Sequence, residues 1–354
     1  MTRAILSRRT LLQGTAAAAA TVYAQPLRAA APEPTAITPA LIEAAKKEGK
    51  VVWYTSIELF LAERIAKSFE AKFPGVAVRV ERTGAERVFQ RIGQEYASRI
   101  RAVDVVNSSD AAHFITWKRE GLLASFVPED VARHYPAEHK DPDGMSASFR
   151  VSLSGIAYNT SLVKPADAPK SFADLLDPKW VGKIVKAHPG YSGTALTATF
   201  QLVRALGWDY FEKLAKQRVM QVQSATDPPK KLALGERAVM CDGGEYNVLQ
   251  LKDSGGPVEM VYPSEGIPVV VGPNGLFKAA PNPNAARLFQ CYSFTPECQQ
   301  LIIDLGALRS MHALVKERPG RPPMRDIKTM QEDAAGVEKS GEEIKARYSK
   351  LFGV

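Results

Sequence analysis

The sequence predicts an α/β protein of two lobes, each a mainly parallel sheet flanked by helices. A chain of 354 residues exceeds one typical hydrophobic core, so two domains are expected. Short β-branched runs alternate with amphipathic helical segments up to about residue 120, and the same alternation returns from residue 155 onward. An apolar content of 45% with 24% charged residues is typical of a globular protein.

The first 31 residues are predicted to be an export signal. Arg8 and Arg9 form a twin-arginine motif in front of an apolar run, residues 15–24, that is too short to span a bilayer. Small residues follow and place the cleavage site after Ala24 or after Ala31, with no cysteine there to carry a lipid. The predicted location is the periplasm, reached through twin-arginine (Tat) export after folding.

Charge and motifs exclude several function classes. The net charge is +8, and +4 remains once the four arginines of the signal are removed. No run of Lys or Arg with interleaved aromatic residues occurs, so no nucleic-acid partner is expected. Hydrolase, metalloprotease and Walker motifs are absent, and the five scattered histidines are expected in surface or capping roles. We therefore expect no enzyme and no cofactor.

Strand and helix units follow one another in the expected first lobe. A helix at 39–48 begins after Thr38, a good cap. Strands are predicted at 51–54, 76–82 and 103–106, where β-branched and aromatic residues cluster or alternate. Amphipathic helices are predicted from residue 58, at 85–99 and at 111–120. This order favours a parallel sheet with helices on its faces.

The same alternation continues in the second half. Strands are predicted at 155–158, 183–186, 219–223, 238–241, 258–262 and 267–271. Helices are predicted at 195–206, 208–216, 228–234, 285–293 and 296–305, and a last one at about 341–351 after a Pro/Gly-rich segment. Two α/β lobes joined by more than one crossing of the chain account for this order.

Three cysteines, Cys241, Cys291 and Cys298, lack the spacing of a metal site. Cys291 and Cys298 flank a short segment that contains Pro296, and an oxidising compartment permits a disulfide between them. Three buried free thiols are an equally good expectation, and the sequence leaves both open.

Two stretches of the second half are distinctive: residues 155–160 read Gly-Ile-Ala-Tyr-Asn-Thr, and residues 169–184 end in Asp-Leu-Leu-Asp-Pro-Lys-Trp-x-Gly-Lys-Ile. Both resemble stretches of the extracellular solute-binding proteins of ABC importers, family 1. Residues 274–286 and 294–306 resemble a returning strand with its helix cap and a later helix. The resemblance covers almost all of the chain after the signal and leans toward the ferric-iron-type cluster.

The resemblance implies a type II periplasmic-binding-protein fold with a ligand cleft between two lobes. Lobe one would hold residues 36–147 and 266–305, and lobe two would hold residues 148–265 and 306–354. Hinge closure would capture a small-molecule solute, and the closed monomer would deliver it to an ABC permease in the inner membrane. A periplasmic partner of a sensor, or a periplasmic enzyme, is the alternative from another class.

Four loops at the expected carboxyl edge of the strands are candidate ligand-binding loops. Each offers hydroxyl groups or glycine at a helix N-terminus, where free N–H groups and the helix dipole favour an anion. The alternative for each is a plain helix cap. The candidates are Tyr54, Thr55 and Ser56 after the first strand, Thr83, Gly84 and Arg87 after the second, Ser108 and Ser109 after the third, and Ser192, Gly193 and Thr194 at the start of the main helix of lobe two.

Ferric iron is the alternative ligand that the resemblance raises. Iron-binding relatives use chiefly two tyrosines of lobe two, with a histidine and a carboxylate of lobe one in some members. The matching place here, Glu245-Tyr246, has one tyrosine, and the first-strand loop offers Glu58 and no histidine. A hard cation wants several anionic oxygens. We therefore expect a small organic or phosphorylated anion, held with help from Arg82 or Arg87, and expect Tyr246, Glu245 and Glu58 as ligands if the solute is iron.

Overall fold

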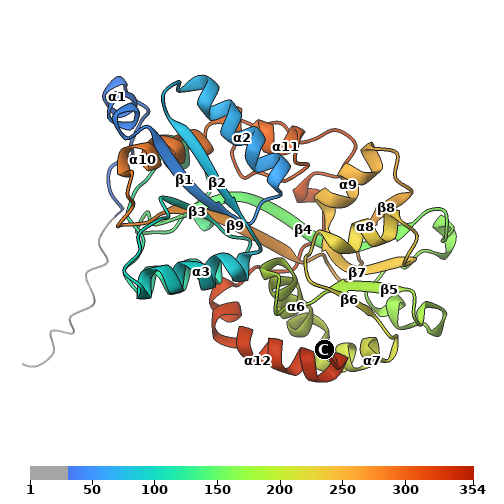
Figure 1. Ribbon diagram of the computed structural model, residues 1–354. Coiled ribbons are helices and arrows are strands. Elements are labelled where there is room, and N and C mark those ends of the chain that lie inside the picture. The colour runs from blue at the N-terminus through green and yellow to red at the C-terminus, as the bar shows by residue number, and fades with distance from the viewer. Residues whose placement is uncertain (1–30) are drawn as a thin grey trace, which may run out of the picture. The chain divides into compact units, whose positions relative to one another are not determined.

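Strand β4 (Ala147–Asn159) organises the sheet of the computed structural model, which describes residues 31–354. Its first part, residues 147–153, pairs antiparallel with β9 (Val269–Leu276). Its second part pairs antiparallel with β7 (Val239–Gly244) and β8 (Val258–Val261). One continuous buried strand therefore takes part in both halves of the sheet (Figure 1).

The first half of the sheet is parallel apart from its junction with β9. Strand β1 (Lys50–Thr55) pairs in parallel with β2 (Ala77–Arg82) and β3 (Val105–Asn107), and β3 pairs antiparallel with β9. The helices here are α1 (Pro39–Glu48), α2 (Leu59–Lys72), α3 (Ala85–Ala97), α4 (Ala112–Arg119), α5 (Glu129–His134), α10 (Pro283–Ser293) and α11 (Pro296–Asp304). A core that includes Trp53, Phe69 and Phe289 holds α1, α2, α5, α10 and α11 to the sheet, and a second core that includes Ile92 and Trp117 holds α3 and α4.

The second half repeats this arrangement. Strand β5 (Ile184–Ala187) pairs in parallel with β6 (Met220–Val222) and with β7. The helices of this half are α6 (Gly193–Leu206), α7 (Trp208–Lys216), α8 (Asp227–Ala233) and α9 (Glu245–Asp253). The C-terminal helix α12 (Ala334–Phe352) packs against α6 and α7 and also against α4 of the first half (Figure 1). Phe172, Leu202 and Phe211 anchor the local core.

The predicted α/β class is confirmed, and the sheet order is β2-β1-β3-β9-β4-β7-β5-β6 with β8 attached to β4. The sheet is mixed because β4, β8 and β9 run antiparallel to their neighbours. Strand β4 begins at Ala147 rather than at Gly155, and α12 begins at Ala334 rather than near Gly341. The predicted lobe limits stay a prediction, and the sheet change within β4 places a natural boundary near Ser154.

The cysteines are free thiols, which was one of the two expectations left open by the sequence. Cys241, Cys291 and Cys298 are all free and buried, so the disulfide between Cys291 and Cys298 is not formed. Burial raises the pKa of Cys291 to about 12, which keeps this thiol protonated. The predicted export signal, residues 1–31, lies outside the described residues except for Ala31. Among the described residues, no helix has both the length and the apolar character needed to cross a membrane.

Candidate functional site

A cavity of about 180 Å³ lies where loops at the carboxyl ends of β1, β2 and β3 meet the first turns of α6, α8 and α9. This volume is below the range of about 300–1,000 Å³ that is common for ligand pockets, so it suits a small solute. Its lining consists of Ser56, Arg82, Thr83, Gly84, Ala85, Arg87, Ser109, Arg150, Tyr191, Ser192, Thr194, residues 223–227 and Tyr246.

Arg150 is a buried charge in the wall of this cavity. It stands on β4 and is 3% exposed, and its Nη2 lies 3.2 Å from Ser56 Oγ. Its Nε lies 3.5 Å from Asn107 Oδ1, and no carboxylate of the described residues forms an ion pair with it. Burial lowers the pKa of Arg150, but a guanidinium remains charged at any physiological pH. A buried charge without a partner is costly, so this wall favours an anion.

Ser56 presents a hydrogen-bond donor beside Arg150. Its Oγ accepts hydrogen bonds from Ser109 N at 2.8 Å and from Arg150 Nη2 at 3.2 Å. Because a hydroxyl oxygen has two acceptor lone pairs, both are filled and only the O–H remains for a ligand. The loop after β1 therefore adds a donor to the arginine.

The loop after β2 and the first turn of α3 face the loops before α6 and α8 across the cavity. Arg87 Nη2 lies 3.4 Å from Gln223 Oε1, and a Cβ on Gly84 would lie 3.4 Å from the carbonyl oxygen of Tyr191. Arg82 donates Nε to Ile57 O at 3.0 Å, which leaves its terminal nitrogens for a ligand. Two further guanidinium groups are thus added to the same cavity.

Helix α6 brings its N-terminus to the cavity. Ser192 caps it, with Oγ accepting from Ala195 N at 3.3 Å, and both Ser192 and Thr194 line the cavity. The amides of Gly193 and Thr194 have no acceptor among residues 31–354. Gly193 packs closely on the opposite loop, since a Cβ there would lie 2.7 Å from Asp110 Cβ. Free N–H groups at a helix N-terminus bind anions.

Glu245 and Tyr246 separate in the structure although they are neighbours in sequence. Tyr246 lines the cavity, and burial together with Glu58 raises its pKa to about 12, so the phenol stays protonated. Glu245 is 1% exposed and does not line the cavity, because both of its oxygens bond the Arg309 guanidinium at 2.7 and 2.8 Å. Tyr262 also donates its hydroxyl to Glu245 at 2.5 Å.

Five other predicted residues do not line the cavity: Gly193, described above, and Tyr54, Thr55, Glu58 and Ser108, which bond neighbouring groups. Tyr54 donates its hydroxyl to Glu95, and Thr55 Oγ1 accepts from Ile57 N. Glu58 accepts from Asn247 Nδ2 at 2.7 Å, and Ser108 Oγ accepts from Asp110 N. Those that do line the cavity are Ser56, Thr83, Gly84, Arg87, Ser109, Ser192, Thr194 and Tyr246. Ligand binding by any of them stays a prediction.

Comparison with protein families gives one match that spans most of the chain. Residues 102–318 match a family described as bacterial extracellular solute-binding protein. The chain belongs to this family. An uncharacterized protein of Haemophilus influenzae is 25% identical over 267 residues, covering 73% of this chain and 76% of that protein. A probable ABC transporter periplasmic-binding protein, y4fP of Sinorhizobium fredii, is 26% identical over 160 residues, covering 43% and 44%.

Solved structures of similar fold are periplasmic binding proteins. AfuA from Actinobacillus pleuropneumoniae, with exogenous fructose-6-phosphate bound, has a TM-score of 0.79 and 25% identity, covering 86% of this chain and 99% of that one. Iron-bound HitA from Pseudomonas aeruginosa has a TM-score of 0.74 and 22% identity, covering 84% and 99%. The fold of this solute-binding protein is therefore the predicted type II periplasmic-binding-protein fold.

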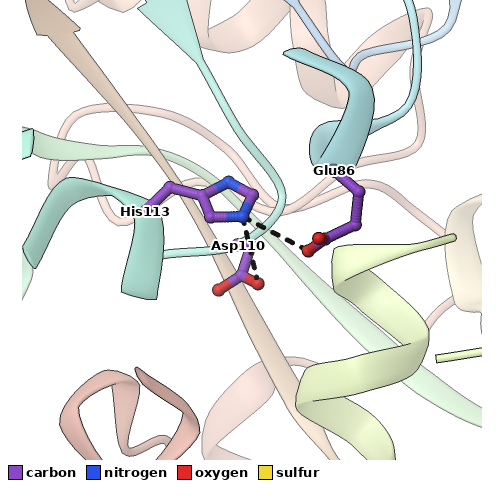
Figure 2. Close-up of side chains that lie close together, drawn as sticks. All are labelled: Glu86, Asp110 and His113. Atoms are coloured by element: carbon purple, nitrogen blue, oxygen red, sulfur yellow. Dashed lines mark hydrogen bonds and ion pairs between the residues drawn. The ribbon is translucent and has the colours of Figure 1, made fainter. Parts of the chain in front are cut away.

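A buried cluster of this solute-binding protein consists of Glu86, Asp110 and His113, none of which lines the cavity (Figure 2). His113 Nε2 lies 3.3 Å from Glu86 Oε1 and 3.6 Å from Asp110 Oδ2. This group has the ligand types of a metal site, but Lys345 of α12 places its Nζ 2.9 Å from Glu86 Oε2. The ammonium already supplies a cation, so the cluster is a compensated ionic network. His113 is buried, so the surface part of the expected surface or capping role was wrong for it.

The ionisation of the cluster follows from these contacts. Burial alone would raise the pKa of Glu86, but His113 and Lys345 outweigh it and lower that pKa to about 2. Burial raises the pKa of the Asp110 carboxyl, against the opposing effect of His113. The network joins α3, the loop before α4 and α12, and so connects the C-terminal helix to the loop that carries Ser109.

Arg150, Tyr191 and the loop 223–227 also line the cavity, and none of them was among the predicted site residues. Arg150 is a charged residue inside β4, whose thirteen residues are all buried, but the strand predicted from sequence began at Gly155 and did not include it. The loop 223–227 looks in sequence like an ordinary cap for the helix that follows it. Its role as lining depends on which loop faces it, and that is a tertiary property.

Proposed function

We propose that this protein is the periplasmic solute-binding component of an ABC importer and that it captures a small organic or phosphorylated anion. The observation that carries the proposal is Arg150, a buried guanidinium that lines the cavity without an ion pair among the described residues. An anionic ligand would supply the missing partner. Importer membership is supported by the family match and by the printed name of the S. fredii relative.

The other polar groups of the cavity support an anion as well. Ser56 and protonated Tyr246 offer O–H donors, and Arg82 and Arg87 add positive charge. The first turn of α6 offers amide donors whose dipole favours negative charge. Oxygen atoms of a phosphate or carboxylate accept several hydrogen bonds at once, and charge-assisted bonds are the stronger ones. The ligand bound to AfuA, fructose-6-phosphate, carries such a group.

Free ferric iron fits this cavity poorly. Of the three residues expected as iron ligands, Glu245 is committed to Arg309 and Glu58 is bonded to Asn247. Tyr246 would have to lose a proton whose pKa is about 12, beside three arginines that repel a cation. A hard trivalent ion needs several anionic oxygens, and the lining offers one carboxylate, Asp227.

Transport would follow the usual logic of a two-lobed binding protein. The solute contacts both halves and stabilises the closed state through its differential affinity for that state. The closed monomer would then dock on an inner-membrane permease, and no covalent chemistry is involved. The predicted twin-arginine signal would bring the folded protein to the periplasm.

A thermal-shift screen of the mature protein tests the proposal. The panel contains inorganic phosphate, sugar phosphates, phosphonates, carboxylates, polyamines and ferric citrate. We expect stabilisation by one or more anions, because binding to the folded state raises stability by mass action. Stabilisation by ferric iron with a visible tyrosinate charge-transfer band would instead establish an iron carrier. Turnover of a substrate without stabilisation by any solute would contradict a binding protein.

A further inference from the structure

Asp227 is the one carboxylate among the residues that line the cavity, and it lies at the first position of α8. Its Oδ2 accepts from Ser224 N at 3.2 Å, and no other hydrogen bond to its side chain is present among residues 31–354. It forms no ion pair within the described chain, although three arginines line the same cavity. Its charge is therefore not neutralised by direct contact with Arg82, Arg87 or Arg150.

Asp227 and Arg150 both line the cavity without an ion pair between them, so a solute meets a carboxylate and a guanidinium as two separate ends of the lining. Arg150 bonds Ser56 of the loop after β1 and Asn107, the last residue of β3. Asp227 bonds only within its own loop. Arg150 and the hydroxyl of Ser56 beside it are donors, whereas the Asp227 carboxylate offers acceptors only. A solute that fills both ends must therefore change from acceptor to donor along its length.

The geometry points to a bipolar solute: an anionic group toward Arg150 and a hydroxyl or ammonium donor toward Asp227. This inference rests on the proposed function, and it makes Asp227 a specificity-determining residue. A solute with a second anionic group would bring that group against the Asp227 carboxylate inside a cavity of about 180 Å³. Repulsion of like charges is an efficient way to reject a wrong ligand.

Two matched probes separate the two ends. Glycerol 3-phosphate and 3-phosphoglycerate share a phosphate and a three-carbon chain, but one ends in a hydroxymethyl group and the other in a carboxylate. Inorganic phosphate reports on the anion end alone. The proteins are the mature wild type, Asp227→Asn, and Asp209→Asn as a matched control, because Asp209 is an exposed aspartate in the first turn of α7. Asparagine can still accept from Ser224 N, so the loop is retained.

Isothermal titration calorimetry measures the outcome. We expect wild-type protein to bind 3-phosphoglycerate at least tenfold more weakly than glycerol 3-phosphate. Asp227→Asn should strengthen 3-phosphoglycerate binding about tenfold and weaken glycerol 3-phosphate, while Asp209→Asn and the binding of inorganic phosphate stay within about twofold of wild type. No gain for 3-phosphoglycerate in Asp227→Asn overturns the inference, and phosphate binding in that case leaves the proposed function standing. If the wild-type protein binds none of the three probes and no anion of the thermal-shift panel, the proposed function itself is overturned.

Discussion

Two buried arginines of this protein differ in whether they form an ion pair. Arg309 is 1% exposed and holds Glu245 in a bidentate ion pair, whereas Arg150 is 3% exposed and has no ion pair within the described chain. The two are joined through Val151, whose backbone exchanges hydrogen bonds with Arg309 at 2.8 and 2.9 Å. Arg309 thus pairs with the residue next to Arg150 in β4, and the two guanidinium groups bond different partners. We infer that Arg309 serves the fold and that Arg150 serves the ligand.

Removing Arg309 should give the largest loss of stability. Arg309→Met leaves Glu245 buried with a tyrosine hydroxyl as its remaining partner. Breaking a buried ion pair from one side costs about 3–5 kcal/mol. Urea denaturation measures the free energy of unfolding. Arg79→Met, at an exposed pair with Glu81, is the control and should change stability by less than about 1 kcal/mol. A loss for Arg309→Met no larger than that of the control would refute the structural role.

Removing Arg150 should produce the reverse pattern. Arg150→Met deletes an uncompensated buried charge, so the free energy of unfolding should stay equal or rise. Affinity for the best anion of the panel should fall by about 2–4 kcal/mol, or roughly 30-fold to 1,000-fold, because a buried charge partner is lost. Calorimetry and urea denaturation on the same sample give both values. If Arg150→Met loses as much stability as Arg309→Met and still binds the anion with wild-type affinity, Arg150 has a structural role and is not a ligand-binding residue.

The sequence could predict the elements but not this distinction. Strands and helices follow from local periodicity, and the loops at strand ends follow from topology, so Ser56, Thr83, Ser109 and Thr194 were found. The partner of Glu245 lies 64 residues away in the chain, and no local pattern connects the two. Arg150 was not predicted because the expected strand began at Gly155 and so left Arg150 outside it, whereas β4 begins at Ala147. Ligand preference depends on which charges are already paired, and that requires the folded structure.

A third buried charge, Glu86, allows the comparison to be tested by pH. Its pKa of about 2 lies below the ordinary value of 4.5 because His113 and Lys345 favour the ionised form over the cost of burial. A depressed pKa contributes stability above about pH 4.5, and this contribution is lost as the pH falls toward 2. We expect on the order of 2–3 kcal/mol for it.

Urea denaturation at pH 6 and pH 3 measures this contribution. In Glu86→Gln, the free energy of unfolding should differ less between pH 6 and pH 3 than it does in wild type. Glu338→Gln, on α12 and paired with Arg119 at the surface, should keep the wild-type difference. Equal pH dependence in Glu86→Gln and wild type would show that this cluster does not hold Glu86 in the ionised form.

Gly193 gives the smallest effect and shows how tightly the anion end is built. A Cβ at Gly193 would lie 2.7 Å from Asp110 Cβ and 3.2 Å from Ala85 Cβ, atoms that cannot move without the backbone. Gly193→Ala should therefore push the first turn of α6 away from the opposite loop and weaken anion binding about tenfold, as overpacking costs about 1–3 kcal/mol.

Gly341→Ala in α12 is the matched helical control, because its Cβ would make an ordinary contact of 3.5 Å with Leu196. The affinity of Gly341→Ala for the anion should equal that of wild type. Its free energy of unfolding should rise by about 0.5–1 kcal/mol, because alanine is a better helix former than glycine. Calorimetry with the same anion compares the two variants. An unchanged affinity in Gly193→Ala would mean that the contact between α6 and Asp110 is not needed in the bound state, and the amides of α6 would then lose their place beside Arg150 as anion donors.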